Sequence, residues 1–229
     1  MLIKQILIAY SFLISANVFA QDKTNDQWQK LKVDENLTAM FPKDVEKIDT
    51  LLQKDNIEMK FKVFKATTAY ANLGITVTTE GTDIKADNAE DLERAYKGIE
   101  IGFRKNATSR GLTCIFSDTV VDKITGRKAV LYTKDQENSS SAVFYLFLLN
   151  DKLYEIASSP VDGSAMEITD RSKLVAGLHF TAVEISEKKF GSKAESWGYK
   201  IGELIGEIIG FLAIAGLIVG IIIYITKRK

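Results

Sequence analysis

The sequence predicts an α+β fold, in which an antiparallel meandering sheet is covered by two main helices, followed by one C-terminal transmembrane helix. Three observations predict this class. Many short segments alternate apolar and polar residues, which is typical of strands with one buried face. Two longer segments carry apolar residues at helical spacing. Residues 208–226 carry no charge, and as a helix they would span about 28 Å, close to the ~30 Å hydrocarbon core of a bilayer.

Residues 1–20 have the pattern of a secretory signal peptide. Lys4 precedes an apolar run, and Val18 and Ala20 suit cleavage by signal peptidase after Ala20. The run is short for a membrane span, so cleavage is favoured over the alternative, an uncleaved signal anchor. The new N-terminus at Gln21 would resemble those of proteins exported by Gram-negative bacteria.

The strands of the predicted sheet follow from alternation and from the turns between them. The segment 142–149 is apolar on both faces, so it is expected to be a central strand. Turns are predicted at Asp34-Glu35-Asn36, at Thr125-Gly126 and at Asn150-Asp151. The predicted strands, in chain order, are 28–33, 37–41, 57–63, 73–77, 112–116, 128–132, 142–149 and 152–158.

The first helix is predicted between a capping residue, Asp87 or Asn88, and Gly111 at the C′ position. Glu90 completes a capping box with Asp87. The apolar stripe of this helix consists of Leu92, Tyr96, Ile99 and Phe103.

The second helix is predicted at 165–176. Ser164 and Glu167 have the spacing of another capping box, and Gly177 is expected to end the helix. Antiparallel strands with two covering helices give an α+β sandwich.

The order of these elements resembles that of the PsbP-like fold superfamily, over roughly residues 27–182. The shared landmarks are an early hairpin ending in Phe41-Pro42, long meandering strands, a central helix, further hairpins and a closing helix. The superfamily is named for an extrinsic subunit of the oxygen-evolving photosystem and includes many exported bacterial domains. The membrane segment sets this chain apart from the photosynthetic members. The resemblance implies a protein-binding or accessory module more often than an enzyme, and it assigns no functional residue.

Composition restricts the chemistry of the predicted domain. Cys114 is the only cysteine, so an intrachain disulfide is excluded. The segment 112–116 around it is predicted to be a buried strand, so Cys114 is expected to be a small core residue rather than a reactive thiol. His179 is the only histidine and is expected to be a polar group at the edge of the fold rather than a catalytic one.

No metal, cofactor or nucleic acid is predicted to bind. Outside the signal peptide, the membrane segment and the C-terminal Lys227-Arg228-Lys229 the charges nearly cancel, with a net charge of −2, which is unlike a nucleic-acid-binding surface. One acidic group does not match the spacing of an EF-hand loop and surrounds a helix start, where acids are favourable in any case. It consists of Asp83, Asp87, Glu90, Asp91 and Glu93.

The two apolar ends of the chain predict a single-pass protein of the inner (cell) membrane. Lys227-Arg228-Lys229 is expected to stay in the cytoplasm, which leaves the domain in the periplasm. The predicted parts are a signal peptide (1–20), an extracytoplasmic α+β domain (21–186), a juxtamembrane connection (187–200), a transmembrane helix (201–226) and a cytoplasmic stub (227–229).

The transmembrane helix carries a glycine-zipper pattern, which predicts association with a second copy or with another membrane protein. The alternative is that glycine is simply common in membrane helices. Glu203 and Glu207 lie i, i+4 near the outer boundary, where they can reach headgroup water; alternatively they ring a small pore or meet a partner's cation. The glycines concerned are Gly202, Gly206, Gly210, Gly216 and Gly220.

The function expected from these features is a membrane-tethered extracytoplasmic binding or accessory module. The sequence has no paired nucleophile and base, no metal-ligand spacing and no phosphate-binding glycine loop, so an enzyme is not expected. Two alternatives stay open: a cell-envelope enzyme without a recognisable motif, and a subunit of a membrane complex whose transmembrane helix is the active element.

Overall fold

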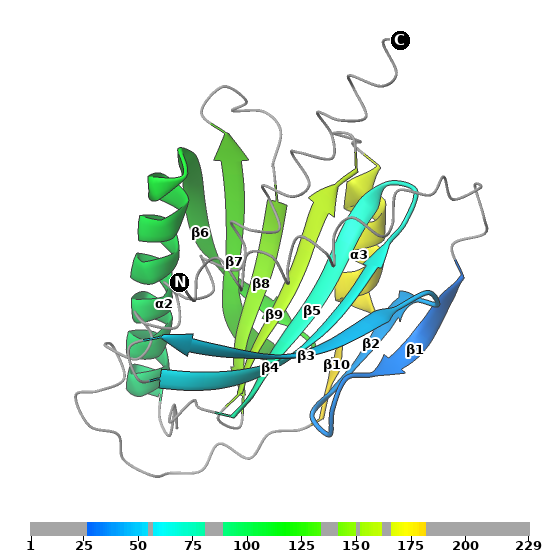
Figure 1. Ribbon diagram of the computed structural model, residues 1–229, viewed down its shortest axis with the longest axis horizontal. Coiled ribbons are helices and arrows are strands. Elements are labelled where there is room, and N and C mark those ends of the chain that lie inside the picture. Colours follow the sequence, from blue (N-terminus) through cyan, green and yellow to red (C-terminus); the bar gives the residue numbers. More distant parts are fainter. Residues whose placement is uncertain are drawn as a thin grey trace.

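The computed structural model describes residues 27–54, 57–80, 89–133, 142–149, 152–161 and 166–181. Two antiparallel sheets and two helices make up this part of the chain (Figure 1). The helices are α2 (Ala89–Ser109) and α3 (Glu167–Ala176). The strands are β1 (Trp28–Lys32), β2 (Leu37–Pro42), β3 (Glu46–Lys54), β4 (Ile57–Thr67), β5 (Ala71–Glu80), β6 (Leu112–Val121), β7 (Ile124–Thr133), β8 (Ala142–Leu149), β9 (Lys152–Pro160) and β10 (His179–Phe180).

The large sheet joins two meanders, in the order β3-β4-β5-β9-β8-β7-β6. The chain passes through β3, β4 and β5, and then α2 leads to β6 at the opposite edge. The strands β6 to β9 return across the sheet until β9 pairs with β5. Strand β9 is therefore the central strand, where the two halves of the sequence meet.

The two faces of the large sheet pack into two separate apolar cores, because successive side chains of a strand point to opposite faces. On β4, Phe61 belongs to the core under α2, whereas Phe64 belongs to the core under the small sheet and α3. The small sheet has the order β1-β2-β10. Figure 1 shows α2 beside β6 at one side, with the small sheet and α3 at the other.

Helix α3 is fixed to the large sheet by polar side chains as well as by Leu174. Its buried acids, Glu167 and Asp170, accept hydrogen bonds from the hydroxyl groups of Ser158 on β9 and Thr68 beside β5. The prediction that Ser164 and Glu167 form a capping box at the start of this helix is wrong. The N-cap residue is Met166 with no side-chain cap, and Glu167 is used for packing against β9 instead.

Most predicted elements are confirmed, and three expectations about the strands need correction. The single covered sheet is in fact two sheets, because β1, β2 and β10 separate from the rest. The segment 112–116 is part of a strand, but β6 is an edge strand and Ile115 is 53 % exposed, so it is not a buried strand. The segment 46–54, predicted as no element, forms β3 at the other edge.

The turn predicted at Thr125-Gly126 lies three residues earlier. Asp122 and Lys123 form the β6–β7 turn, and both have positive φ, 47° and 70°, as a two-residue type I′ hairpin requires. Gly126 lies within β7, where an added Cβ would be 2.4 Å from the carbonyl oxygen of Leu146. The glycine is needed there for a close approach, not for a turn. Gly111 has φ +74°, which confirms its expected position after the first helix.

Several expectations fall outside the described residues. They concern the signal peptide, the capping residues Asp87 and Asn88, the turn Asn150-Asp151, and the connection, transmembrane helix and stub from 187 to 229. Within the residues described above, no helix has both the length and the apolar character needed to cross a membrane.

Candidate functional site

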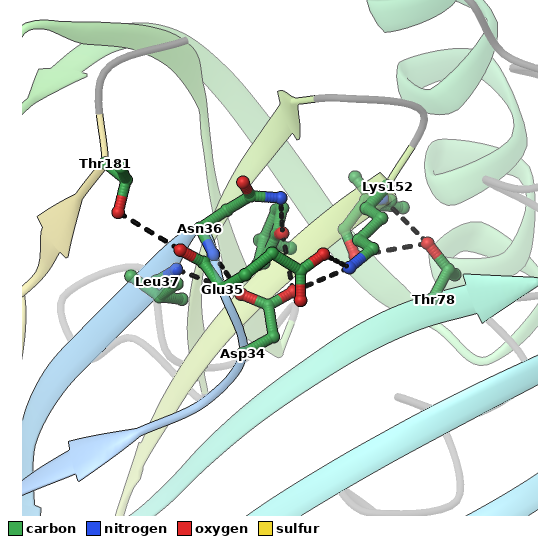
Figure 2. A network of polar contacts seen from close by, with 9 residues as sticks. Asp34, Glu35, Asn36, Leu37, Thr78, Lys152 and Thr181 are labelled. Atoms are coloured by element: carbon green, nitrogen blue, oxygen red, sulfur yellow. Dashed lines mark hydrogen bonds and ion pairs between the residues drawn. The ribbon is translucent and has the colours of Figure 1, made fainter.

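The turn between β1 and β2 is the centre of a polar network that also involves β9. Asp34 accepts hydrogen bonds at both carboxylate oxygens (Figure 2). Its Oδ1 binds the backbone N–H groups of Asn36 and Leu37, each at 2.9 Å. Its Oδ2 accepts from Lys152 Nζ at 3.0 Å and from the Tyr154 hydroxyl at 2.8 Å. One carboxylate thus shapes the turn and fastens it to the central strand.

The partners of Asp34 on β9, Lys152 and Tyr154, also interact with other residues of the turn. Tyr154 is 0 % exposed, and its hydroxyl oxygen accepts a hydrogen bond from Asn36 Nδ2 at 3.1 Å. Lys152 Nζ also forms an ion pair with Glu35. The backbone N–H of the next residue, Leu153, donates to Thr78 Oγ1 at 2.7 Å, which holds the start of β9 against β5. Figure 2 shows Lys152 between the turn and Thr78.

The electrostatics keep each member of this network in a single protonation state around neutral pH. Burial alone would raise the pKa of Asp34, but hydrogen bonds from Tyr154, Lys152 and the Asn36 N–H outweigh burial and lower it. Burial would lower the pKa of Lys152, but its bonds to Glu35 and Asp34 raise it. Burial also raises the pKa of Tyr154. The arrangement is suited to holding the fold together rather than to moving protons.

The same turn holds the last residues that the structure describes. Strand β10 pairs with β2, and the Thr181 N–H donates to the Asn36 carbonyl at 2.9 Å. Thr181 Oγ1 donates to the Glu35 carbonyl at 3.2 Å (Figure 2). We call this group of residues the exit clamp: Asp34, Glu35, Asn36, Lys152, Tyr154 and Thr181. It fixes the point from which the sequence continues toward the predicted membrane segment.

On the side away from the clamp, β10 is held by the β6–β7 turn. Asp122 Oδ2 accepts the Phe180 N–H at 2.7 Å and lies 2.9 Å from His179 Nδ1. The imidazole is largely exposed. His179 is thus a polar group at the edge of the fold, as the sequence predicted, and it lies beside a single carboxylate.

A second polar cluster joins α2 to the β6–β7 edge of the large sheet. The buried guanidinium of Arg127 binds Glu93 and Glu100 on α2 and Asp118 on β6, the last two at 3.1 Å. Its central carbon lies 4.8 Å from the ring centroid of Tyr96. Burial would lower the pKa of Arg127, but the carboxylates, Glu93 first, raise it. This cluster stabilises the position of the helix.

Glu155 differs from these acids because it has no partner. Its side chain is 4 % exposed on β9, and no hydrogen bond or ion pair joins it to a residue in the described ranges. Its carboxylate oxygens therefore keep slight contact with solvent, because every completely buried side-chain oxygen in those ranges has a partner. Burial raises its pKa to about 8. Glu155 does not stand out in the sequence, since a glutamate between apolar residues in a strand is typical of a solvent-facing position.

The other residues weighed from the sequence are placed as follows. Cys114 is buried in the core under α2, as expected, and burial raises its pKa to about 12. Of the acidic group, Glu90 and Asp91 pair with Arg94, and Glu93 pairs with Arg127. Within the described ranges no three potential metal ligands come together. The predicted membrane residues, Gly202, Gly206, Gly210, Gly216, Gly220, Glu203 and Glu207, lie outside those ranges.

Comparison with known proteins adds no relative. No protein-family model, curated protein or solved structure matches this chain.

Proposed function

We propose that this chain is a membrane-tethered extracytoplasmic binding or accessory module. The observation that carries the proposal is the exit clamp. A strand of only two residues, such as β10, would fray without further bonds, because terminal segments order only when they are tied down. Two hydrogen bonds from Thr181 to the β1–β2 turn supply that attachment, 20 residues before the predicted span begins at residue 201. A domain held by a tether needs a firm attachment at this point.

An accessory role fits the chemistry of the domain better than an enzymatic role does. In the exit clamp Lys152 binds Asp34, and in the second cluster the buried Arg127 binds carboxylates of α2 and β6, so these charges hold strands and helices together. We propose a PsbP-like sandwich within the α+β class, on the Phe41-Pro42 hairpin and the order of the elements. The ligand would be a protein of the cell envelope, since the resemblance favours protein binding.

In-cell photo-crosslinking of the full chain tests this function. A photoreactive amino acid is placed singly at apolar residues that the structure leaves exposed on different elements: Leu51 on β3, Ile101 on α2, Val120 on β6 and Ile168 on α3. We expect one of these positions to capture one envelope protein reproducibly and the other positions not to capture it. The proposal is wrong if no position captures a protein while the purified full chain hydrolyses an envelope substrate, the outcome that favours the enzyme.

The predicted transmembrane helix supports a second candidate, association within the membrane. Gly202, Gly206 and Gly210 recur every four residues, which lets a second helix approach closely. Replacing Gly206 and Gly210 by leucine should abolish span-to-span crosslinking in membranes. Ile208→Leu, on the opposite side of the helix, is the matched control and should leave crosslinking unchanged. Equal crosslinking in all three proteins would contradict association through this groove.

A further inference from the structure

Glu155 is buried on the face of the large sheet that also packs against α2. Across the strands it is in register with Thr76 of β5 and Leu146 of β8. Its neighbours on the same face of β9, Leu153 and Ala157, pack in the core under α2. A buried carboxylate without a hydrogen bond or a counter-charge is strongly unfavourable, so the neutral acid is the stable form in this place.

Among the residues that the structure describes, no charged group on the surrounding elements is available to neutralise it. In its own row across the sheet, Leu146 separates Glu155 from Arg127, and Arg127 is already surrounded by three carboxylates. The remaining groups on this face have other partners. Lys65 pairs with Glu46 on β3, and Arg94 pairs with Glu90 and Asp91. Arg104 donates a hydrogen bond to the Cys114 carbonyl, and the Tyr96 hydroxyl bonds to backbone groups of Thr125 and Leu148. Lys97 on α2 is exposed to solvent instead.

We propose that Glu155 makes the packing of α2 on the large sheet pH-dependent, so that opening of this helix–sheet layer releases one proton from the Glu155 carboxyl group. Acidic conditions then keep α2 closed on the sheet, and rising pH makes opening easier. If the domain lies outside the cytoplasm, as proposed above, the pH that acts on Glu155 is that of the surroundings. The device itself follows from the burial of the carboxyl group and does not depend on that location.

The direction and range of the effect follow from linkage. The pKa of Glu155 is raised by burial from 4.5 to about 8 in the closed fold. The stabilisation of the closed layer is thus fully present below about pH 4.5, falls as the pH rises, and is fully lost above about pH 8. Between these limits the opening equilibrium changes roughly tenfold per pH unit, because one proton is released.

The single native cysteine provides the measurement. Cys114 is buried in the same core under α2, so a thiol reagent modifies it only when the layer opens. The full chain in detergent micelles is labelled with dithiodipyridine at pH values from 5 to 8, for the wild type and for Glu155→Gln. Dividing the two rates at each pH removes the reagent's own pH dependence. The ratio is expected to rise by more than a hundredfold across this range.

Controls separate this device from other effects. Glu90→Gln, an exposed acid on α2, should keep the wild-type profile. Amide exchange on the same samples should show faster opening of α2 at high pH while β1 and β2 stay protected. Should Glu155→Gln not fold, Glu155→Met serves in its place. The proposal is overturned by a ratio that does not change with pH, or by exchange that rises equally in all elements, which would mean global unfolding.

Discussion

Removing the hydroxyl group of Tyr154 is the change that tests the exit clamp most selectively. In Tyr154→Phe the ring still fills its place in the core, but the charge-assisted bond to Asp34 and the bond from Asn36 are lost. The first is worth about 1.5–3 kcal/mol and the second about 0.5–1.5 kcal/mol. We expect the free energy of unfolding to fall by about 2–4 kcal/mol, which lowers the folding equilibrium constant roughly 30- to 1000-fold.

The assay is denaturant unfolding of the full chain in detergent micelles. Trp28 in β1 is the fluorescent reporter, because Lys173 lies 4.4 Å from the centre of its ring and the contact breaks on unfolding. Trp197→Phe removes the only other tryptophan from the signal. Tyr70→Phe is the matched control, since Tyr70 is 41 % exposed at the β4–β5 turn and should change stability by less than about 0.5 kcal/mol. Equal effects of the two substitutions would refute the energetic role given to the clamp.

Two further predictions use the same unfolding assay. Gly126→Ala should destabilise the fold by about 1–3 kcal/mol, because the new Cβ meets the Leu146 carbonyl oxygen, whereas Gly74→Ala, with 3.8 Å to its nearest atom, should be nearly neutral. Asp34 has a lowered pKa in the fold, so its contribution is present above its ordinary pKa of 3.8 and is lost as the pH falls below that value. Asp34→Asn should therefore reduce stability at pH 7 and flatten the acid-induced loss; an unchanged acid profile would contradict the bonding described for Asp34.

The strands that the sequence predicted well are those whose residue pattern reports their own environment. Strand β8 is apolar on both faces because it is an interior strand with cores on both sides, and β4 alternates because its residues enter those cores in turn. Strand β3 was missed because an edge strand has one unpaired side, which tolerates the charges of Glu46, Lys47 and Asp49. Gly126 was misinterpreted because a glycine signals either a turn or a close contact, and only the pairing with β8 tells which.

The polar sites could be predicted only in part, because their members are distant in sequence. The turn at Asp34 was predicted, but Lys152 and Tyr154 are 118 and 120 residues away and meet it only once the small sheet lies against β9. Glu155 looks like a solvent-facing residue until its neighbours on β8 and β9 are placed in the core under α2. No local pattern tells which face of the sheet a helix will cover.

The central claim is that the apolar C-terminal segment holds the domain outside the cytoplasm, and single-cysteine labelling tests it most directly. In a Cys114→Ser background, a cysteine is introduced at Ser192 in the predicted connection or at Lys229 in the predicted stub. Intact spheroplasts are then treated with a thiol probe that does not cross membranes. We predict that Ser192→Cys is labelled at once and Lys229→Cys only after detergent is added. Labelling of both positions in intact spheroplasts, or of Lys229→Cys alone, would contradict the account.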